Sequence, residues 1–280
     1  MLNRVKVKID EKNMSTADLK KVIRQRPNTR ILGVVRFHLG LYNLSGNNEK
    51  KRFNRWLRSI GEAPVVYSPF MTERSKKQLE LYLNNKGYYK ASVSDSVWFK
   101  KKKAYVEYRV QAGLVTRIQD FNYQADSGVI VNELPYSSPV FRMMAADSAH
   151  TLIRREMPMD VDVLEKERER VTETLRTNGY YNFSKNYIQY YADTSKNGSP
   201  EKADLIMTII NSLPDSMAYR KYTIGNIRVN LDYDPVLAAS AADSLYQRAY
   251  YNNYEVVYNG EMKIKPKVIL ETIQFDRGEQ

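Results

Sequence analysis

The chain has 280 residues, of which 42% are hydrophobic and 27% are charged, so its composition supports packed domains and excludes a disordered tail. It contains no cysteine, which excludes disulfides, thiolate catalysis and cysteine-based zinc sites. The formal net charge is +12, and residues 1–110 carry 25 Lys and Arg against 9 Asp and Glu. This asymmetry indicates either an anionic partner or a well-solvated basic face, and both interpretations stay open.

The first elements are short. Residues 2–9 alternate apolar and basic side chains, which predicts a half-buried strand. Residues 15–25 begin with Ser15 or Thr16 as N-cap and predict an amphipathic helix that stops at Pro27. No stretch of the sequence approaches the roughly 20 apolar residues of a membrane-spanning helix.

Residues 28–66 do not fit a simple repeat, and we interpret them as an insertion. They include a basic helical segment whose apolar side chains share one face, which is more typical of core packing than of a partner groove: Phe53, Trp56, Leu57 and Ile60. Three arginines flank this face and form a candidate basic surface: Arg52, Arg55 and Arg58. A basic amphipathic helix can lie on an anionic bilayer surface or receive an acidic partner.

A second helix is predicted after residue 75, with Ser75 and Gln78 as a capping box and Gly87 as its left-handed stop. A strand follows in which alternate residues share one side: Ala91, Val93, Asp95, Val97 and Phe99. Four lysines then predict a turn, and residues 104–113 return as the partner strand of a hairpin. These lysines are a second candidate basic surface, although a solvated hairpin tip is the simpler interpretation: Lys100, Lys101, Lys102 and Lys103.

The pattern then restarts. Residues 115–123 predict a strand, residues 124–146 a loop and residues 147–156 a short helix. A longer helix has a capping box at Asp162 and Glu165 and ends at Gly179, after which two more strands form a hairpin. A third start follows at residue 222, with a strand, a tyrosine-rich insertion at residues 235–263 and a helix that begins at Pro266.

The repeating order of elements is β-α-α-β-β, with a period of roughly a hundred residues. It predicts the α+β class: small domains, each with a three-stranded mixed sheet and two helices on one face. We expect units at residues 1–113, with the insertion at about 28–66, at residues 114–220, and at residues 221–280 as the truncated start of a third.

The helix that ends in "GYY" and the following strand, turn and strand resemble the POTRA repeat of BamA- and TamA-type outer-membrane assembly proteins. The residues that carry the resemblance are a Gly-Tyr pair after the second helix and a glycine that closes the third strand. In the first unit these structural turn residues are Gly87, Tyr88 and Gly113. In the second they are Gly179 and Tyr180, with Ser212 in place of the closing glycine.

The insertion, with "RQRPNTRILG", "LGLYNL" and "WLRSIGEAPVVY", resembles the first POTRA unit of the TamL family, lipid-anchored TamA-like proteins of Bacteroidota. The resemblance implies a periplasmic location in an outer-membrane-anchored lipoprotein, with a lipidated cysteine before this segment and a membrane β-barrel after it. We therefore expect the sequence to be part of a longer protein.

The sequence shows no motif of an enzyme, a nucleotide cradle or a metal site, so we predict no catalytic residue, no cofactor and no metal. His38 and His150 lie in different units without ligand spacing. Asp160, Asp162 and Glu165 cluster at a helix start, where the helix dipole favours negative charge.

The sheet edges are the predicted binding sites, because an edge strand can pair with an extended client segment. The resemblance implies that the second strand of each unit is this edge. The candidate residues are Ala91, Val93, Asp95, Val97, Phe99, Phe183, Tyr187, Gln189 and Tyr191.

We expect a non-enzymatic scaffold that binds outer-membrane precursors and other envelope assembly proteins, and possible contact with an anionic membrane surface, rather than nucleic acid. The alternative is a nucleic-acid-binding array, favoured by the basic first unit. The GXXG loop that KH-type binding requires is missing between the predicted helices.

Overall fold

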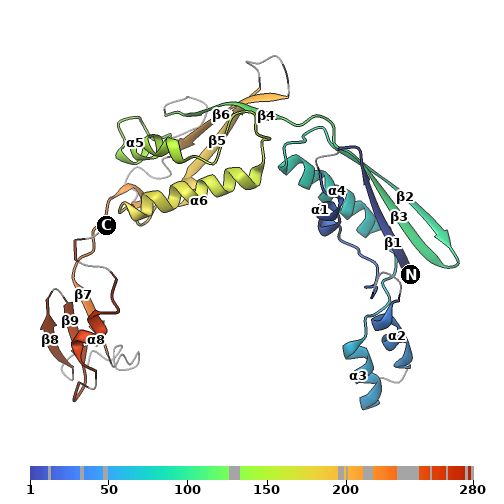
Figure 1. The fold of residues 1–280 in the computed structure, drawn as a ribbon, viewed down its shortest axis with the longest axis horizontal. Helices are drawn as coiled ribbons and strands as arrows, with labels where there is room; N and C mark the ends of the chain where they lie inside the picture. Colours follow the sequence, from blue (N-terminus) through green and yellow to red (C-terminus); the bar gives the residue numbers. More distant parts are fainter. Residues whose placement is uncertain are drawn as a thin grey trace. The chain divides into compact units, whose positions relative to one another are not determined.

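The structure is a computed structural model that describes residues 1–11, 14–31, 35–46, 50–125, 133–194, 199, 201–210, 217–231, 246–252, 254–262, 264–274 and 277–278. The strands are β1 Leu2–Ile9, β2 Ser92–Lys100, β3 Lys103–Gln111, β4 Arg117–Tyr123, β5 Ile188–Asp193, β6 Lys202–Ile209, β7 Ile227–Asn230, β8 Gln247–Tyr251 and β9 Tyr254–Tyr258. The α-helices are α1 Thr16–Val22, α2 Phe37–Leu44, α3 Arg52–Ile60, α4 Pro69–Asn85, α5 Pro139–Ala146, α6 Val161–Thr177 and α8 Pro266–Leu270 (Figure 1). Short 3-10 helices are η1 Asp147–His150, η2 Lys185–Tyr187 and η3 Met217–Tyr219.

In the part of the chain that the structure describes, three sheets of three strands repeat one topology, in which the third strand of each set lies in the centre. Their orders are β1-β3-β2, β4-β6-β5 and β7-β9-β8. In the first and third sheets the central strand pairs parallel with one neighbour and antiparallel with the other. The predicted α+β class with mixed three-stranded sheets is therefore confirmed.

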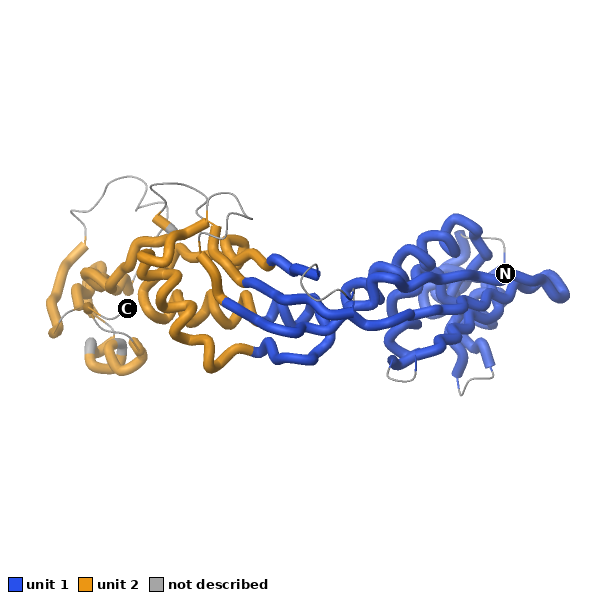
Figure 2. The backbone as a smooth tube through the Cα atoms, turned by 90° about the horizontal axis from the view of Figure 1, so that it is seen from above, with its two compact units in different colours: residues 1–122, 152–166, 191–206 blue, residues 123–151, 167–190, 207–280 orange. Residues whose placement is uncertain are grey.

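The chain separates into two compact units, shown in Figure 2. Unit 1 comprises residues 1–122, 152–166 and 191–206, and unit 2 comprises residues 123–151, 167–190 and 207–280. The domain limits expected from the sequence stay a prediction. Within the described residues no helix has the length and apolar character that a membrane span requires.

The first sheet packs its core against α1 and α4. Apolar residues of β1, β2 and β3 point inward and meet Leu19 of α1, Ile23 at its C-cap, and Leu79 and Leu83 of α4. Tyr108 at the centre of β3 is almost fully buried, and this burial raises the pKa of its hydroxyl. This core fixes which face of β2 is turned toward the helices.

The second helix of the first unit is longer than expected, and the predicted capping box at Ser75 was wrong. Helix α4 begins at Pro69, and Ser75 is buried in its interior. The Ser75 hydroxyl donates to the carbonyl of Met71 at 2.7 Å and accepts from the backbone N–H of Arg24 at 3.1 Å. A serine inside a helix can satisfy its hydroxyl on the preceding turn, so the motif alone did not place the helix start.

The start of α6 also differs from the prediction. Asp160, rather than Asp162, acts as the cap, because its carboxylate accepts the backbone N–H of Asp162 at 2.9 Å. The predicted loop at residues 124–146 contains α5, which Pro139 opens in the first helical turn, a position that proline tolerates. Only η1 covers the start of the short helix expected at residues 147–156.

The prediction missed two strands in the stretch read as a tyrosine-rich insertion. Residues 247–251 and 254–258 form β8 and β9, which complete a sheet with β7. Asn252 lies between them with φ 50°, a left-handed conformation that asparagine adopts more readily than most residues. Ser212, expected to replace a closing glycine, lies outside the described residues.

Candidate partner-binding edge

Strand β2 lies at an edge of the first sheet and pairs only with β3 within that sheet. Backbone polar groups alternate between the two sides of an antiparallel strand. The N–H of Val93 donates to the Glu80 carboxylate of α4 at 3.2 Å, so it points away from β3. The N–H and C=O groups of Val93, Asp95, Val97 and Phe99 therefore face outward from the sheet.

Helix α4 lines this edge with charged side chains. Lys76 of α4 forms an ion pair with Asp95 of β2 at 3.3 Å and a second with Glu73 at 3.1 Å. Hydrogen bonds to these two carboxylates raise the pKa of Lys76, so its charge is held beside the strand. Glu80 lies one helical turn further on. The sequence pattern did not reveal Glu80 as an edge residue, because nothing in its spacing shows which strand it faces.

The candidate residues of β2 lie in three environments. Ala91 precedes the strand and is half-buried. Val93 is buried in the core, while Asp95 and Val97 are half-buried beneath the helix layer. Phe99 is 67% exposed, and its ring meets Tyr67 edge-on at 5.7 Å between centroids. Strand β2 therefore directs backbone N–H and C=O groups away from β3, packs Val93 into the core, and ends at the exposed ring of Phe99.

Strand β5 is the corresponding edge of the second sheet, but two of its four candidate residues are misplaced. Gln189 and Tyr191 lie in β5. Phe183 precedes the strand and is fully buried, and Tyr187 belongs to η2. The edge prediction is therefore wrong for Phe183 and Tyr187. The physical reason is that the chain after Gly179 first fills the core with an aromatic ring and makes a 3-10 turn before it becomes extended.

The face of α3 differs from the core-packing interpretation. Leu57 is buried at 5% exposure, whereas Phe53 is 65% and Trp56 55% exposed, and Ile60 is also exposed. The rings of Phe53 and Trp56 stack with centroids 5.9 Å apart. A helix of a small hairpin can bury only a narrow stripe, and here the stripe is centred on Leu57.

The candidate basic residues of α3 differ in exposure. Arg52 and Arg55 are exposed. Arg58 is half-buried and fastens α3 to the end of α2: it donates to the Ser45 hydroxyl at 3.0 Å and to the Gly46 carbonyl at 2.9 Å. The prediction of Arg58 as a binding surface is therefore wrong, because its hydrogen-bonding groups serve the hairpin. Lys100–Lys103 are all exposed at the β2–β3 turn.

The Gly-Tyr motif forms the same hydrogen-bonded helix end twice. Gly87 has φ +88°, with Gly87 N–H bonded to Asn84 O at 2.9 Å and Tyr88 N–H to Leu83 O at 3.0 Å. This is the Schellman arrangement. The same arrangement ends α6. Gly179 has φ +91°, and the N–H groups of Gly179 and Tyr180 bond to Arg176 O and Leu175 O, each at 3.0 Å.

Only the first tyrosine after each glycine packs in the interior. Tyr88 and Tyr180 are buried, whereas Tyr89 and Tyr181 are exposed. Gly113 follows β3 with φ +71°, near the backbone of Lys90. The motif therefore shapes the entry to the edge strand rather than supplying a chemical group.

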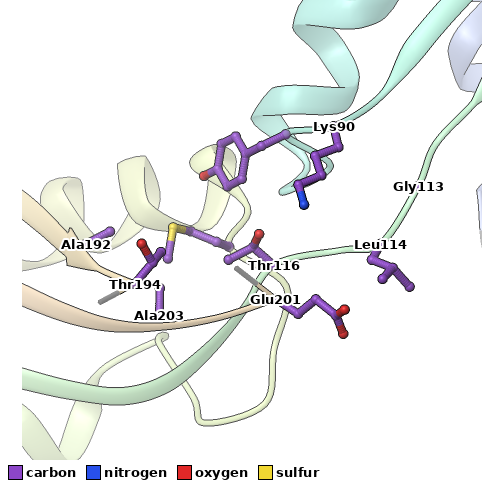
Figure 3. A pocket seen from close by; sticks show the side chains of 10 residues that line it. Lys90, Gly113, Leu114, Thr116, Ala192, Thr194, Glu201 and Ala203 are labelled. Atoms are coloured by element: carbon purple, nitrogen blue, oxygen red, sulfur yellow. The ribbon is translucent and has the colours of Figure 1, made fainter. Parts of the chain in front are cut away.

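A cavity of about 480 Å³ lies in unit 1 beside the Gly-Tyr segment (Figure 3). Its charged lining residues are Lys90 and Glu201, and the remaining lining is mostly apolar or threonine. In Figure 3 Lys90 belongs to the segment after α4, whereas Ala192 and Ala203 lie on β5 and β6. This lining suits an apolar group better than acid–base chemistry.

The histidines and acidic clusters have structural partners. His38 Nδ1 lies 3.2 Å from the Ile60 carbonyl, and His150 Nδ1 lies 2.7 Å from Asp147. Asp160 and Asp162 bind the Lys86 ammonium at 2.8 and 2.7 Å. No group of three metal-ligating side chains occurs in the described part of the chain.

Residues 2–113 match the POTRA family model, described as the surface antigen variable number repeat. POTRA domains 3–5 of Haemophilus influenzae BamA are similar at 12% identity and a TM-score of 0.39, covering 93% of this chain and 96% of that chain. BamA from Haemophilus ducreyi lacking POTRA domains 1–3 is 15% identical, with a TM-score of 0.33 and coverage of 67% and 28%.

POTRA domains 1–3 of the periplasmic domain of Omp85 from Anabaena are 11% identical, with a TM-score of 0.33 and coverage of 99% and 77%. A comparison with curated proteins found no match. Residues 2–113 therefore match the POTRA family, and the α+β fold with its three mixed three-stranded sheets is consistent with POTRA domains in tandem.

Proposed function

We propose that this chain is part of a non-enzymatic periplasmic scaffold of an outer-membrane protein assembly or translocation factor. It receives partner proteins or unfolded barrel precursors, chiefly by β-augmentation at β2. The POTRA match over residues 2–113 supports the class of protein. The outward backbone of β2 is the observation that carries the mechanism.

The proposed binding step uses main-chain hydrogen bonds. An extended client pairs with the outward N–H and C=O groups of Asp95, Val97 and Phe99, which accept many sequences because backbone groups are common to all clients. Strands of membrane barrels alternate apolar and polar side chains, so one face of such a client can meet Phe99 and the other can face water. The Lys76–Asp95 pair lies at the same edge and favours polar client side chains there.

We propose further that the protein is a lipid-anchored member of the TamL family. The resemblance of the insertion to TamL supports a lipid-anchored protein of that family, located on the periplasmic side of the outer membrane and continued by a β-barrel. A role in outer-membrane protein assembly is proposed for this chain on the POTRA match over residues 2–113.

The test compares two variants at one position. Val97→Pro removes an outward N–H, and Val97→Ala removes similar side-chain packing while the N–H stays. We expect Val97→Pro to weaken binding of a peptide with alternating apolar and polar residues roughly fivefold or more, and Val97→Ala to leave binding nearly unchanged. Proline is tolerated on an edge strand, so the free energy of unfolding falls by only about 1 kcal/mol.

Isothermal titration calorimetry measures the affinity, and circular dichroism checks the fold. Equal affinity of the two variants for the peptide would reject augmentation at β2. Tight binding of DNA with a steep salt dependence, in place of peptide binding, would support the nucleic-acid alternative.

A further inference from the structure

Helix α3 presents an aromatic and basic surface that the edge mechanism does not use. The stacked rings of Phe53 and Trp56 are more than half exposed. Arg52 and Arg55, both exposed, lie on the same short helix. Large apolar side chains left in water are unfavourable unless another surface covers them, so a partner is expected for this helix.

The charge of this segment indicates the chemistry of the partner. Residues 49–62 contain two acidic residues, Glu49 and Glu62. They contain five basic residues: Lys50, Lys51, Arg52, Arg55 and Arg58. Basic side chains beside exposed Trp and Phe on an amphipathic helix suit the interface of an anionic bilayer, where guanidinium groups meet phosphates and aromatic rings enter the headgroup layer.

The β2–β3 turn adds a second patch of the same composition. Lys100–Lys103 follow Trp98, which is 46% exposed, and the exposed ring of Phe99. Lys101 and Lys102 have φ values of 47° and 59°, as in a type I′ turn, where Asn-Gly is the favoured pair. Lysine is an unfavourable choice for both positions, so its presence at this turn indicates a use for its charge.

Both patches belong to one end of the first sheet, the end at which β1 begins. Ala104 N–H, just after the turn, bonds to the Met1 carbonyl at 2.9 Å. Arg36, immediately before α2, donates to the Asn3 carbonyl at 2.5 Å. In Figure 1 the β2–β3 turn lies beside the N-terminus, and α2 and α3 extend below it.

We propose that this end of the first sheet, with α3 and the β2–β3 turn, binds the surface of an anionic phospholipid bilayer. Phe53 and Trp56 enter the interface, and Arg52, Arg55 and the turn lysines pair with lipid phosphates. Exposed aromatic rings flanked by exposed cationic side chains fit a deformable lipid surface, whereas a protein hot spot requires a well-packed pocket. The proposal rests on α3 and the turn lysines, which the client at β2 does not use, while Phe99 borders both surfaces.

The experiment is flotation with vesicles of phosphatidylcholine alone and with vesicles that also contain phosphatidylglycerol. We expect binding only to the anionic vesicles, weaker binding at high salt with a residual salt-resistant part, and a blue shift of tryptophan emission. Arg52→Gln with Arg55→Gln is expected to weaken vesicle binding roughly tenfold, and Phe53→Ser with Trp56→Ser to abolish the salt-resistant part. Phe70→Ser removes an equally exposed ring from α4 and is expected to leave vesicle binding unchanged.

The turn supplies a second test that separates folding from binding. Lys101→Asn with Lys102→Gly is expected to make the protein harder to unfold in urea, because these residues favour the turn geometry, and yet to weaken vesicle binding. Equal binding to neutral vesicles, no binding to either vesicle, or binding of DNA or an acidic protein in place of vesicles would overturn the proposal. An unchanged affinity of the Arg52→Gln, Arg55→Gln variant would overturn it as well.

Discussion

The backbone N–H of Val93 donates to the carboxylate of Glu80 at 3.2 Å, so a side chain of α4 occupies the first outward position of the β2 edge. An incoming strand that pairs along the whole edge has to displace this carboxylate, whereas pairing from Asp95 onward leaves it in place. Edge strands are commonly protected against unwanted pairing by charged side chains, and Glu80 places a charge at this edge. The β2 edge is therefore open to pairing from Asp95 onward, while the Glu80 carboxylate occupies the N–H of Val93.

Removing the Glu80 carboxylate is expected to strengthen peptide binding at β2. In Glu80→Ala the helix former alanine keeps α4 intact, while the Val93 N–H becomes available to the client. We expect affinity for an alternating peptide to rise about threefold to tenfold, because the client no longer competes with a charged acceptor. Calorimetric titration measures this change.

Glu73→Ala is the matched control, since it removes the same charge from the same helix at a residue that binds Lys76. If the two variants bind the peptide equally well, a general charge effect rather than the Val93 bond sets the affinity.

Substitution of Gly87 is expected to destabilise unit 1 strongly. A Cβ at this residue would lie 3.2 Å from the backbone atoms Met159 N, Met159 O and Thr116 O, and φ is +88°. We expect Gly87→Ala to lower the free energy of unfolding by about 2 kcal/mol or more, from left-handed strain plus backbone crowding. Gly40→Ala, inside α2 with open space around it, is expected to raise it by up to about 1 kcal/mol.

Urea unfolding followed by tryptophan fluorescence measures both variants, because Trp56 and Trp98 are the only tryptophans and both lie within residues 2–113. Equal stability of the two variants would contradict the role assigned to Gly87.

Glu107 is expected to make the stability of the first sheet, β1-β3-β2, fall at acid pH. Its side chain is held by Lys8 at 2.9 Å and Arg109 at 3.0 Å, and these hydrogen bonds lower the pKa of the Glu107 carboxyl. A lowered folded-state pKa gives stability that is present above the unfolded pKa of about 4.3 and is lost as the pH falls through the folded pKa.

Unfolding in urea at a series of pH values compares wild type with Glu107→Gln. We expect the variant to lose stability less steeply below about pH 4.3. Parallel pH profiles for the two proteins would show that Glu107 does not contribute.

Unit 2 contains a buried carboxylate whose partner is expected to be essential. Glu167 is fully buried and pairs with Arg170 at 2.8 Å, and Arg170 also pairs with Asp147. The hydrogen bonds that the Arg170 guanidinium donates to Glu167 and Asp147 raise the pKa of Arg170. Arg170→Met leaves a buried charge without its guanidinium, which is expected to cost about 3–5 kcal/mol.

The double variant Arg170→Met, Glu167→Leu replaces the pair with apolar groups and is expected to recover most of that loss. Circular dichroism during urea unfolding measures all three proteins. A double variant less stable than Arg170→Met would show that the carboxylate has a further structural role.

The sequence predicted the repeated architecture because local signals and tertiary structure agree. The helix stop at Gly87 and its repeat at Gly179 require left-handed backbone, and the alternating pattern of residues 91–99 placed strand β2, although burial alternates only at its start, around Val93. These features depend on neighbours within a few residues, which a sequence displays directly.

Features set by long-range packing were not predictable in the same way. Ser75 lies inside α4 and accepts a hydrogen bond from the backbone N–H of Arg24, a long-range contact that the capping-box pattern does not show. The exposure of Phe53 and Trp56 also depends on what packs against α3. The burial of Phe183 likewise depends on core space that no local pattern encodes. Periodicity identifies a face, while burial depends on what packs against it.

Amide hydrogen exchange of β2, measured residue by residue by NMR, tests augmentation at this edge most directly. The account predicts that an alternating peptide slows exchange at Asp95, Val97 and Phe99, whose N–H groups point outward, and changes exchange little at Ser94, Ser96 and Trp98, which already pair with β3. Unchanged exchange at the three outward amides in the presence of bound peptide would contradict it.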